Sequence, residues 1–263
     1  MKYYSGVGSR ETPMYILYMM SQLSMIFEKQ GFILRSGCAL GADAAFEDAL
    51  FNPAKTAEIY VPDRIFPSKM GTKYKNHYIC PQEQFNQGGF NSLFRQATRL
   101  IHKHEIHRAW RRLSERIMLL HNRNMFQVLG QDLKTKSNFT VCYTRAGETK
   151  YEETNQSTGG TGTAINASDI FGVETFNLGK DEHYIRLSKF IEKYDHLIDY
   201  ERLNKIVPRS DFNKKGKYEV DFITDYNGHM ETIKNDKRKR DIKVGLIKEE
   251  NVVKKNKTRK MRP

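Results

Sequence analysis

The sequence lacks the long apolar runs that a membrane protein needs. No apolar run reaches the roughly 18 residues of a membrane-spanning helix. The first ten residues, MKYYSGVGSR, also lack the successive charged, apolar and small-residue regions of a secretory signal. We therefore expect a cytoplasmic protein with no membrane partner.

Cysteine is scarce, and the three cysteines lie far apart. Cys38, Cys80 and Cys142 form no C-x-x-C pair and are odd in number, which favours neither a disulfide framework nor a thiolate metal site. Three histidines lie between residues 102 and 107, but no carboxylate or cysteine follows them at a metal-ligand spacing. We expect reduced, buried cysteines, and neither a metal nor a cofactor.

Acidic residues are too few to balance the basic ones, and the imbalance is uneven. The formal net charge is +13. Residues 209–263 carry 17 Lys and Arg against 9 Asp and Glu, whereas residues 1–208 carry 27 against 22. We expect residues 201–263 to be a basic, partly flexible extension. Two interpretations of it stay open, namely contact with single-stranded nucleic acid and simple solubility.

Short β-prone runs alternate with helical runs along the first two hundred residues. This order predicts an α/β fold, a Rossmann-like three-layer sandwich with a mainly parallel sheet, over residues 1–200. Periodicity is lost after residue 61, so residues 62–113 are expected to be an insertion or lid. Strands are expected at 2–7, 32–35, 59–61, 139–143 and 173–178, and helices at 14–29, 43–50, 90–104, 114–129 and 182–194, with a further helix opened by residues 159–163. Thr12 as N-cap and Pro13 as the first helical residue would start the first helix.

Three glycine-rich turns each follow an expected strand and precede a helix. Ligands of an open parallel sheet bind beyond the carboxyl ends of its strands, where helix N-termini present backbone N–H groups. Glycine lets the backbone approach a phosphate, hydroxyls add donors, and Arg10 supplies a charge. The sequence therefore predicts a phosphate-binding crevice, with these candidate residues: Gly8, Ser9, Arg10, Ser36, Gly37, Gly41, Asp43, Arg123, Asn124, Gln127, Thr158, Gly159, Gly160, Thr161, Gly162 and Thr163.

Two of these assignments have alternatives. Asp43 would bond a ribose hydroxyl or orient Arg10, or it would only cap the helix that ends near Leu50. Arg123 and Gln127 share a helix face by their four-residue spacing, and a solvated polar face is the alternative to a binding role.

The residues at these turns resemble the SLOG superfamily. This superfamily groups DNA-processing protein A, of the DprA/Smf type, with the lysine-decarboxylase-like, or lonely-guy, nucleotide phosphoribohydrolases. Residues 8–12 (GSRET) and 35–45 (RSGCALGADAA) are similar to the DNA-processing branch, while 120–124 (LHNRN) and 159–163 (GGTGT) are similar to the phosphoribohydrolases. The run RNMFQVLG at 123–130 is most similar to an often phage-borne group. The resemblance implies a nucleotide-binding Rossmann-like domain and a homodimer.

The chain departs from the resemblance at one chemically decisive position. The phosphoribohydrolases carry a Glu three residues after the Gly-Thr pair, where this chain has Asn166. An amide cannot take up or release a proton at neutral pH, so the catalysis does not carry over directly. Whether the chain is an enzyme therefore stays open.

Three functions follow from these observations. The first is a protein that senses or sequesters a nucleotide or a nucleotide-derived small molecule, or binds a nucleic-acid end, through the crevice. The second is a nucleotide N-glycosidase in which Asp43, Glu47 or Glu148 replaces the missing Glu. The third is a single-strand DNA-binding recombination mediator that uses the basic extension and surface aromatic residues such as Tyr3, Tyr4 and Trp110.

Overall fold

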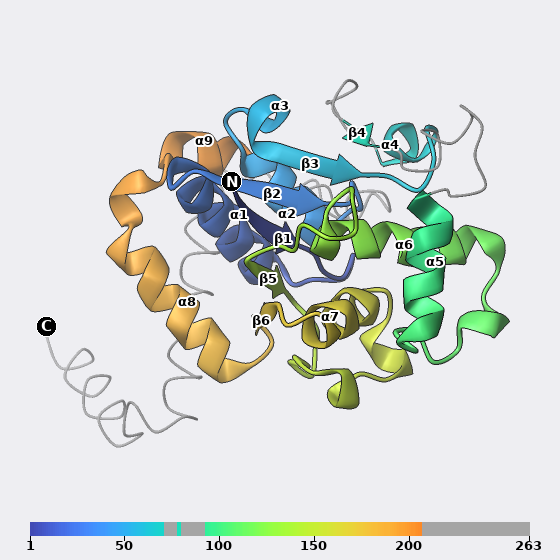
Figure 1. Cartoon of the computed structure of the whole chain (residues 1–263). Coiled ribbons are helices and arrows are strands. Elements are labelled where there is room, and N and C mark those ends of the chain that lie inside the picture. The colour runs from blue at the N-terminus through green and yellow to red at the C-terminus, as the bar shows by residue number, and fades with distance from the viewer. Residues whose placement is uncertain (71–77, 80–92, 207–263) are drawn as a thin grey trace, which may run out of the picture. The chain divides into compact units, whose positions relative to one another are not determined.

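A computed structural model describes residues 1–70, 78–79 and 93–206 (Figure 1). Within these residues, six strands form one parallel sheet in the order β4-β3-β2-β1-β5-β6. The strands are β1 (Lys2–Gly6), β2 (Phe32–Ser36), β3 (Ala57–Tyr60), β4 (Tyr78–Ile79), β5 (Phe139–Cys142) and β6 (Glu174–Asn177). The α/β fold with a parallel sheet is confirmed, and β4 is a strand that the sequence analysis did not anticipate.

Helices cover both faces of this sheet, which confirms the three-layer, Rossmann-like arrangement. Helices α1, α2 and α8 pack on one face, and α5, α6 and α7 pack on the other (Figure 1). Their bounds are α1 (Met14–Lys29), α2 (Ala42–Ala49), α3 (Pro53–Thr56), α4 (Phe66–Lys69), α5 (Leu93–Lys103), α6 (Glu115–Leu129), α7 (Thr161–Ile170), α8 (Asp181–Lys193) and α9 (Tyr200–Lys205).

Aromatic side chains fill the core between the sheet and each layer of helices. On the α1 face, the ring of Tyr4 lies 4.9 Å from that of Phe27 and 5.9 Å from that of Phe139, measured between centroids. On the α6 face, Phe126 stacks on Tyr60 at 5.8 Å. Because successive strand residues point to opposite faces, each strand contributes to both cores.

The arrangement of the chain creates a switch point at β1. From β1 the chain runs to β2, β3 and β4 on one side, and then returns to the other side of β1 to form β5 and β6. The connections that leave the carboxyl ends of β1 and β5 therefore diverge. In open α/β sheets, this divergence leaves a crevice that holds ligands.

The start of α1 differs in detail from the sequence prediction. Pro13 occupies the N-cap position, with φ −59° and ψ 146°, and is not the first helical residue. Thr12 does not cap the helix, because its Oγ1 donates to the carbonyl oxygen of Ser9, 2.7 Å away. The predicted cap instead fixes the loop that follows β1.

The expected insertion and extension are described only in part. Residues 71–77 and 80–92 of the insertion and residues 207–263 of the extension lie outside the described residues, as does Cys80. Helix α9 packs on the domain through buried Leu203 and through Arg202, which donates to the carbonyl oxygen of Leu50. The fold thus continues past residue 200.

Two smaller expectations concern the cysteines and membrane helices. Cys38 and Cys142 are buried and take part in no disulfide among the described residues, as expected. None of the helices in the described part of the chain is long and apolar enough to span a membrane.

Candidate functional site

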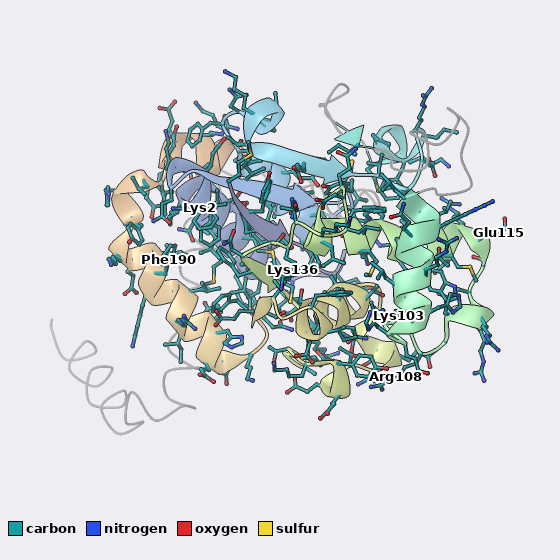
Figure 2. All side chains as sticks on the ribbon, viewed as in Figure 1. Lys2, Lys103, Arg108, Glu115, Lys136 and Phe190 are labelled. Atoms are coloured by element: carbon teal, nitrogen blue, oxygen red, sulfur yellow. The ribbon has the colours of Figure 1, made fainter. Side chains whose placement is uncertain are left out.

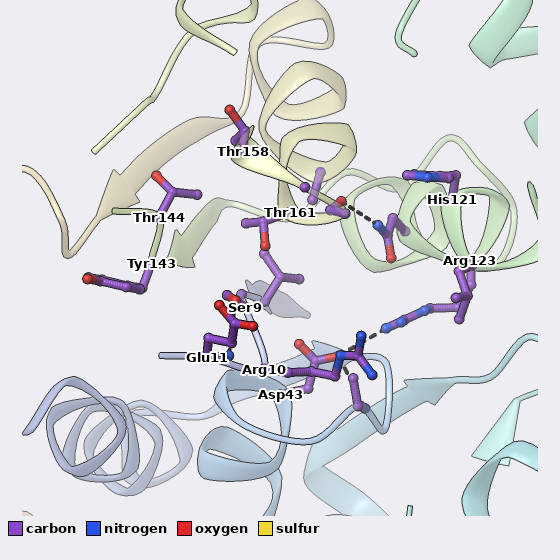
Figure 3. Close-up of a pocket in the computed structure, with 18 of the residues that line it drawn as sticks. Ser9, Arg10, Glu11, Asp43, His121, Arg123, Tyr143, Thr144, Thr158 and Thr161 are labelled. Atoms are coloured by element: carbon purple, nitrogen blue, oxygen red, sulfur yellow. Dashed lines mark hydrogen bonds and ion pairs between the residues drawn. The ribbon is translucent and has the colours of Figure 1, made fainter. Parts of the chain in front are cut away.

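A cleft of about 1330 Å³ lies at the carboxyl edge of the sheet (Figure 3). The loop after β1, the first turn of α2, the segment after β3 with α4, and the segment after β5 form part of its wall. Helix α6 and the N-terminus of α7, with the turn before it, also line the cleft. The cleft therefore occupies the switch point between β1 and β5, where the topology predicts a ligand crevice.

The cleft brings together ten of the sixteen candidate residues. Their side chains or backbone come from four separate parts of the sequence, as the convergence of the glycine-rich turns predicted. The ten lining residues are Gly8, Ser9, Arg10, Asp43, Arg123, Asn124, Thr158, Gly159, Gly160 and Thr161.

Six candidate residues do not line the cleft, and each has a structural reason. Gly37 and Gly41 make room for neighbouring groups, as described below. Gln127 lies one turn deeper along α6 and is buried, and its carbonyl oxygen accepts from Ser5 Oγ at 2.7 Å. The three others are Ser36, which is fully buried, Gly162, which packs near Thr158, and Thr163, which bonds to His121.

The loop after β1 packs directly against the start of α2. The carbonyl oxygen of Ser9 accepts from the N–H of Ala42 at 3.3 Å and from that of Thr12 at 3.4 Å. Gly41 has a φ of +81°, and a Cβ at this position would lie 2.7 Å from the Ser9 carbonyl oxygen. Only glycine fits both the conformation and the space, so the two loops form one continuous wall.

A buried ion pair spans the cleft floor between α6 and α2. Nη1 of Arg123 lies 3.0 Å from Oδ2 of Asp43, and both residues are less than 10% exposed (Figure 3). Burial raises the pKa of the Asp43 carboxyl, while Arg123 acts in the opposite direction. Asp43 also accepts from the Ala39 N–H at 3.4 Å. It orients Arg123, a role that the sequence analysis did not consider.

Arg123 occupies space that any side chain at residue 37 would need. A Cβ on Gly37 would lie 1.2 Å from Nη1 of Arg123. The Nε of Arg123 is buried and has no hydrogen-bond partner in the described part of the chain. Gly37 therefore contributes to the site by admitting a guanidinium, and not by contacting phosphate as predicted.

Helix α6 also positions the N-terminus of α7. Nδ2 of Asn124 donates to the carbonyl oxygen of Gly160 at 2.9 Å (Figure 3). Nδ1 of His121 lies 2.6 Å from Oγ1 of Thr163. A Cβ on Gly160 would meet nothing within 4 Å. Contacts from α6 thus fix the α7 N-terminus, and its backbone is open toward the cleft. An anion site requires both features.

A polar network that was not predicted from the sequence lies after β5. Glu148 lines the cleft and accepts from Oγ1 of Thr158 at 2.9 Å and from Oγ1 of Thr144. Asn177, at the end of β6, donates to the Glu148 carbonyl oxygen at 2.6 Å. The available signal was positional, because Thr144 follows a strand that neighbours β1.

Charges of both signs line the cleft. The arginines are Arg10, Arg116, Arg123 and Arg145, and the acidic residues are Glu11, Asp43, Asp63 and Glu148. Four cations and four carboxylates leave no net charge. Such a lining suits a ligand that carries both an anionic group and hydroxyl or amino donors, rather than a bare polyanion.

Asn166 has a structural position away from the cleft lining. Its Nδ2 donates to the carbonyl oxygen of Ile106 at 2.7 Å, and its Oδ1 accepts from Thr154 Oγ1 at 2.8 Å. Glu47, one of the carboxylates suggested as a replacement, is also outside the lining and accepts from the N–H of Cys38 at 2.7 Å. Asp43 and Glu148 remain in the cleft.

Two of the three aromatic residues suggested for stacking on nucleic-acid bases are buried. Tyr4 is fully buried, and Trp110 is 6% exposed within the α5–α6–α7 core. The ring of Tyr3 is covered by the guanidinium of Arg35, whose Cζ lies 3.8 Å from the ring centroid. The suggestion of a stacking platform is therefore wrong for Tyr4 and Trp110, because their apolar rings pack in the interior.

The histidines between residues 102 and 107 contact aromatic rings. His102 and His107 both lie against Trp110, at centroid distances of 5.8 and 6.3 Å, and His104 lies 5.2 Å from Phe171. In residues 1–70, 78–79 and 93–206, no group of three or more His, Cys, Asp and Glu is arranged to hold a metal ion.

Comparisons of the chain with protein-family models, with curated proteins and with solved structures found no match.

We expect Gly37→Ala to lower the free energy of unfolding by about 3 kcal/mol or more, because the new methyl group displaces Arg123 and breaks a buried ion pair. Urea denaturation measures the change. In an Arg123→Ala background the same substitution should cost much less, since the guanidinium is gone. Gly160→Ala, where space is open, is the control. Equal costs at residues 37 and 160 would contradict the assignment.

Protonation of His121 should destabilise the fold. Burial, followed by His107 and Arg123, lowers the pKa of His121 to about 3. The folded state thus favours the neutral ring. The contribution of the neutral ring to the free energy of unfolding is complete above about pH 6.5 and is lost as the pH falls. Between pH 6.5 and 5 the loss is about 2 kcal/mol.

His121→Gln should flatten the pH dependence of the free energy of unfolding over this interval, measured by urea denaturation at each pH. His196→Gln is the control, because His196 is exposed and lies in the 3-10 turn η5 (Asp195–Leu197). An unchanged profile for His121→Gln would show that another group is responsible.

Proposed function

We propose that the cleft binds a nucleotide or a nucleotide-derived small molecule, and that the protein senses or sequesters it. The observation that carries the proposal is the meeting of the β1 loop and the α7 N-terminus at the switch point of the sheet. The phosphate lies between Ser9, Arg10 and Thr161, where backbone N–H groups, hydroxyls and a guanidinium converge.

The mixed charge of the cleft supports a nucleotide over a simple anion. Glu148 and Asp43 can accept from ribose hydroxyls or base amino groups, while Arg10 and Arg145 can balance phosphate charge. A volume of about 1330 Å³ exceeds the range of roughly 300–1,000 Å³ that is usual for small-molecule pockets, so it accommodates a whole nucleotide. Membership in the SLOG superfamily and homodimer formation belong to the same proposal.

We expect nucleotides to raise the melting temperature of the protein. A ligand at 100 times its Kd adds about 2.7 kcal/mol of stability, which corresponds to a shift of roughly 5–10 °C for a domain of this size. Nucleoside mono-, di- and triphosphates and ADP-ribose are the probes, and differential scanning fluorimetry is the measurement.

Arg10→Ala should remove most of this shift, because Arg10 is exposed and lines the cleft. Arg186→Ala is the matched control, since Arg186 is an exposed arginine on α8 outside the lining. The proposal fails if no nucleotide stabilises the protein, or if Arg10→Ala and the control respond alike.

Nucleotide N-glycosidase activity is a second candidate, favoured by the position of Glu148. This carboxylate lines the cleft and is 6% exposed, with two threonine hydroxyls to hold it. Glu148 would take a proton from a water molecule as the water oxygen bonds to the anomeric carbon and the bond from that carbon to the base breaks, and Glu148 would then pass this proton to the leaving base nitrogen.

Incubation of the protein with nucleoside monophosphates, followed by chromatography for free base, tests this candidate. Activity that Glu148→Gln abolishes and Glu11→Gln retains would establish the enzyme. We expect no release of base, because Asn166 stands where the catalytic Glu of the phosphoribohydrolases is expected. Absence of product from every nucleotide would exclude the glycosidase while leaving the binding proposal intact.

A further inference from the structure

The positive charge of the folded domain is concentrated in one short stretch. Residues 93–116 carry seven Lys and Arg against two Glu, a net charge of +5. The other residues between 1 and 208 carry 20 Lys and Arg and 20 Asp and Glu. The entire net charge of residues 1–208 therefore lies in these 24 residues, far from the basic extension in sequence.

Helix α5 presents three of these cations as a stripe. Arg95, Arg99 and Lys103 follow one another at four-residue intervals and are exposed, so they share a face of the helix. The helix contains no acidic residue. Like charges at this spacing repel and cost about 0.2–0.5 kcal/mol per pair. The stripe thus opposes the stability of its own helix.

Helix α8 provides a comparison, because its exposed cations form an ordinary solvated face. It also carries three exposed cations, Arg186, Lys189 and Lys193, but its sequence includes three acidic residues. Arg186 forms an ion pair with Glu174 at 3.2 Å. The cations of α8 are therefore balanced, whereas those of α5 have no acidic residue on their own helix.

Three more exposed arginines follow α5 in the chain, two in the next turn and one in the first turn of α6. The 3-10 turn η2 (Trp110–Arg112) begins beside the end of α5, because the ring of Trp110 lies 5.8 Å from that of His102. Figure 2 labels Lys103, Arg108 and Glu115 along this stretch. We name as the α5–η2 basic surface these six exposed residues: Arg95, Arg99, Lys103, Arg111, Arg112 and Arg116.

One member of this surface also reaches the cleft. Arg116, in the first turn of α6, is exposed and lines the cleft. Arg99, Lys103, Arg111 and Arg112 form no ion pair with any residue that the structure describes. These four cations are thus available for an external anion, and the basic surface borders the candidate ligand site through Arg116.

We propose that the α5–η2 basic surface binds the phosphate backbone of a nucleic-acid strand. Five of its six residues are arginine, whose planar guanidinium binds phosphate oxygens in bidentate fashion. The linear spacing of the α5 cations matches an extended polyanion better than a single phosphate. This inference goes beyond the proposed function. The α5–η2 basic surface meets the cleft only at Arg116, and its partner is a nucleic-acid strand and not a nucleotide.

An anionic membrane fits the same surface less well. A helix that binds in the membrane interface needs an apolar face to insert. Phe94, Ala97 and Ile101 of α5 are buried in the core, and Leu93 and Leu100 pack partly buried against it. The exposed residues of α5 are Arg95, Arg99, His102 and Lys103, and a nucleic-acid backbone is a polyanion that such a polar, basic face can hold.

The test replaces the α5 stripe in the full chain with Arg95→Gln, Arg99→Gln and Lys103→Gln together. The Kd for a fluorescein-labelled 20-nucleotide single strand is measured by anisotropy at several salt concentrations. Each phosphate contact contributes about 0.7 to the slope of log K against log salt concentration. We expect weaker binding and a slope smaller by about 2, the contribution of three contacts.

The matched control is Arg186→Gln, Lys189→Gln and Lys193→Gln, which removes the same charge from α8. Its salt slope should equal that of the unmodified protein. Glutamine is a good helix former, so the melting temperature of the α5 variant should not fall. An unchanged slope for the α5 variant, or equal losses in both variants, would overturn the proposal.

Two further measurements distinguish this proposal from nucleotide binding in the cleft and from membrane binding. The α5 variant should keep the nucleotide-induced shift in melting temperature, because its three substituted residues lie outside the cleft lining. Sedimentation with vesicles containing phosphatidylserine tests the membrane. If the α5 substitutions reduce vesicle binding and leave strand binding unchanged, the nucleic-acid assignment is wrong.

Discussion

The ion pair between Arg123 and Asp43 joins the two helical layers at the edge of the sheet where the cleft lies. Arg123 comes from α6 and Asp43 from α2, on opposite faces of the sheet. Both are buried, and removing one partner would leave an uncompensated charge in the interior. The position of α6 in turn fixes Asn124 and His121, which hold the α7 N-terminus. Much of the cleft geometry therefore depends on this single contact.

The fold was predictable because its signals are local and repeated. Apolar periodicity, together with the glycines that end helices, such as Gly31 and Gly130, placed the five expected strands and the longer helices within a few residues of their observed bounds, but the short helices α3, α4 and α9 were not predicted. The two-residue strand β4 has no comparable signal, since Tyr78–Ile79 is too short to show a period. Pro13 also shows the limit of cap rules, because the same residue suits the N-cap and the position after it.

The sequence predicted those parts of the site whose positions depend on the backbone and the strand order. It did not predict the parts whose positions depend on side-chain packing. The glycine-rich turns meet because parallel strands bring their carboxyl ends to one edge, so Ser9 and Thr161 both line the cleft. The roles of Gly37 and Thr163 depend on which side chain of α6 lies next to them, a long-range contact without a sequence pattern. The network of Thr144, Glu148 and Asn177 was missed for the same reason, because it joins the segment after β5 to the end of β6.

The space shared by residues 37 and 123 has an evolutionary consequence. Because the guanidinium fills the volume beside the Gly37 backbone, a relative that keeps arginine at position 123 can tolerate only glycine at position 37. A relative with a short side chain at position 123 is freed from that restriction and can carry a larger residue at position 37. The residues at positions 37 and 123 should therefore covary among relatives of this protein, although 86 residues separate the two positions in the chain.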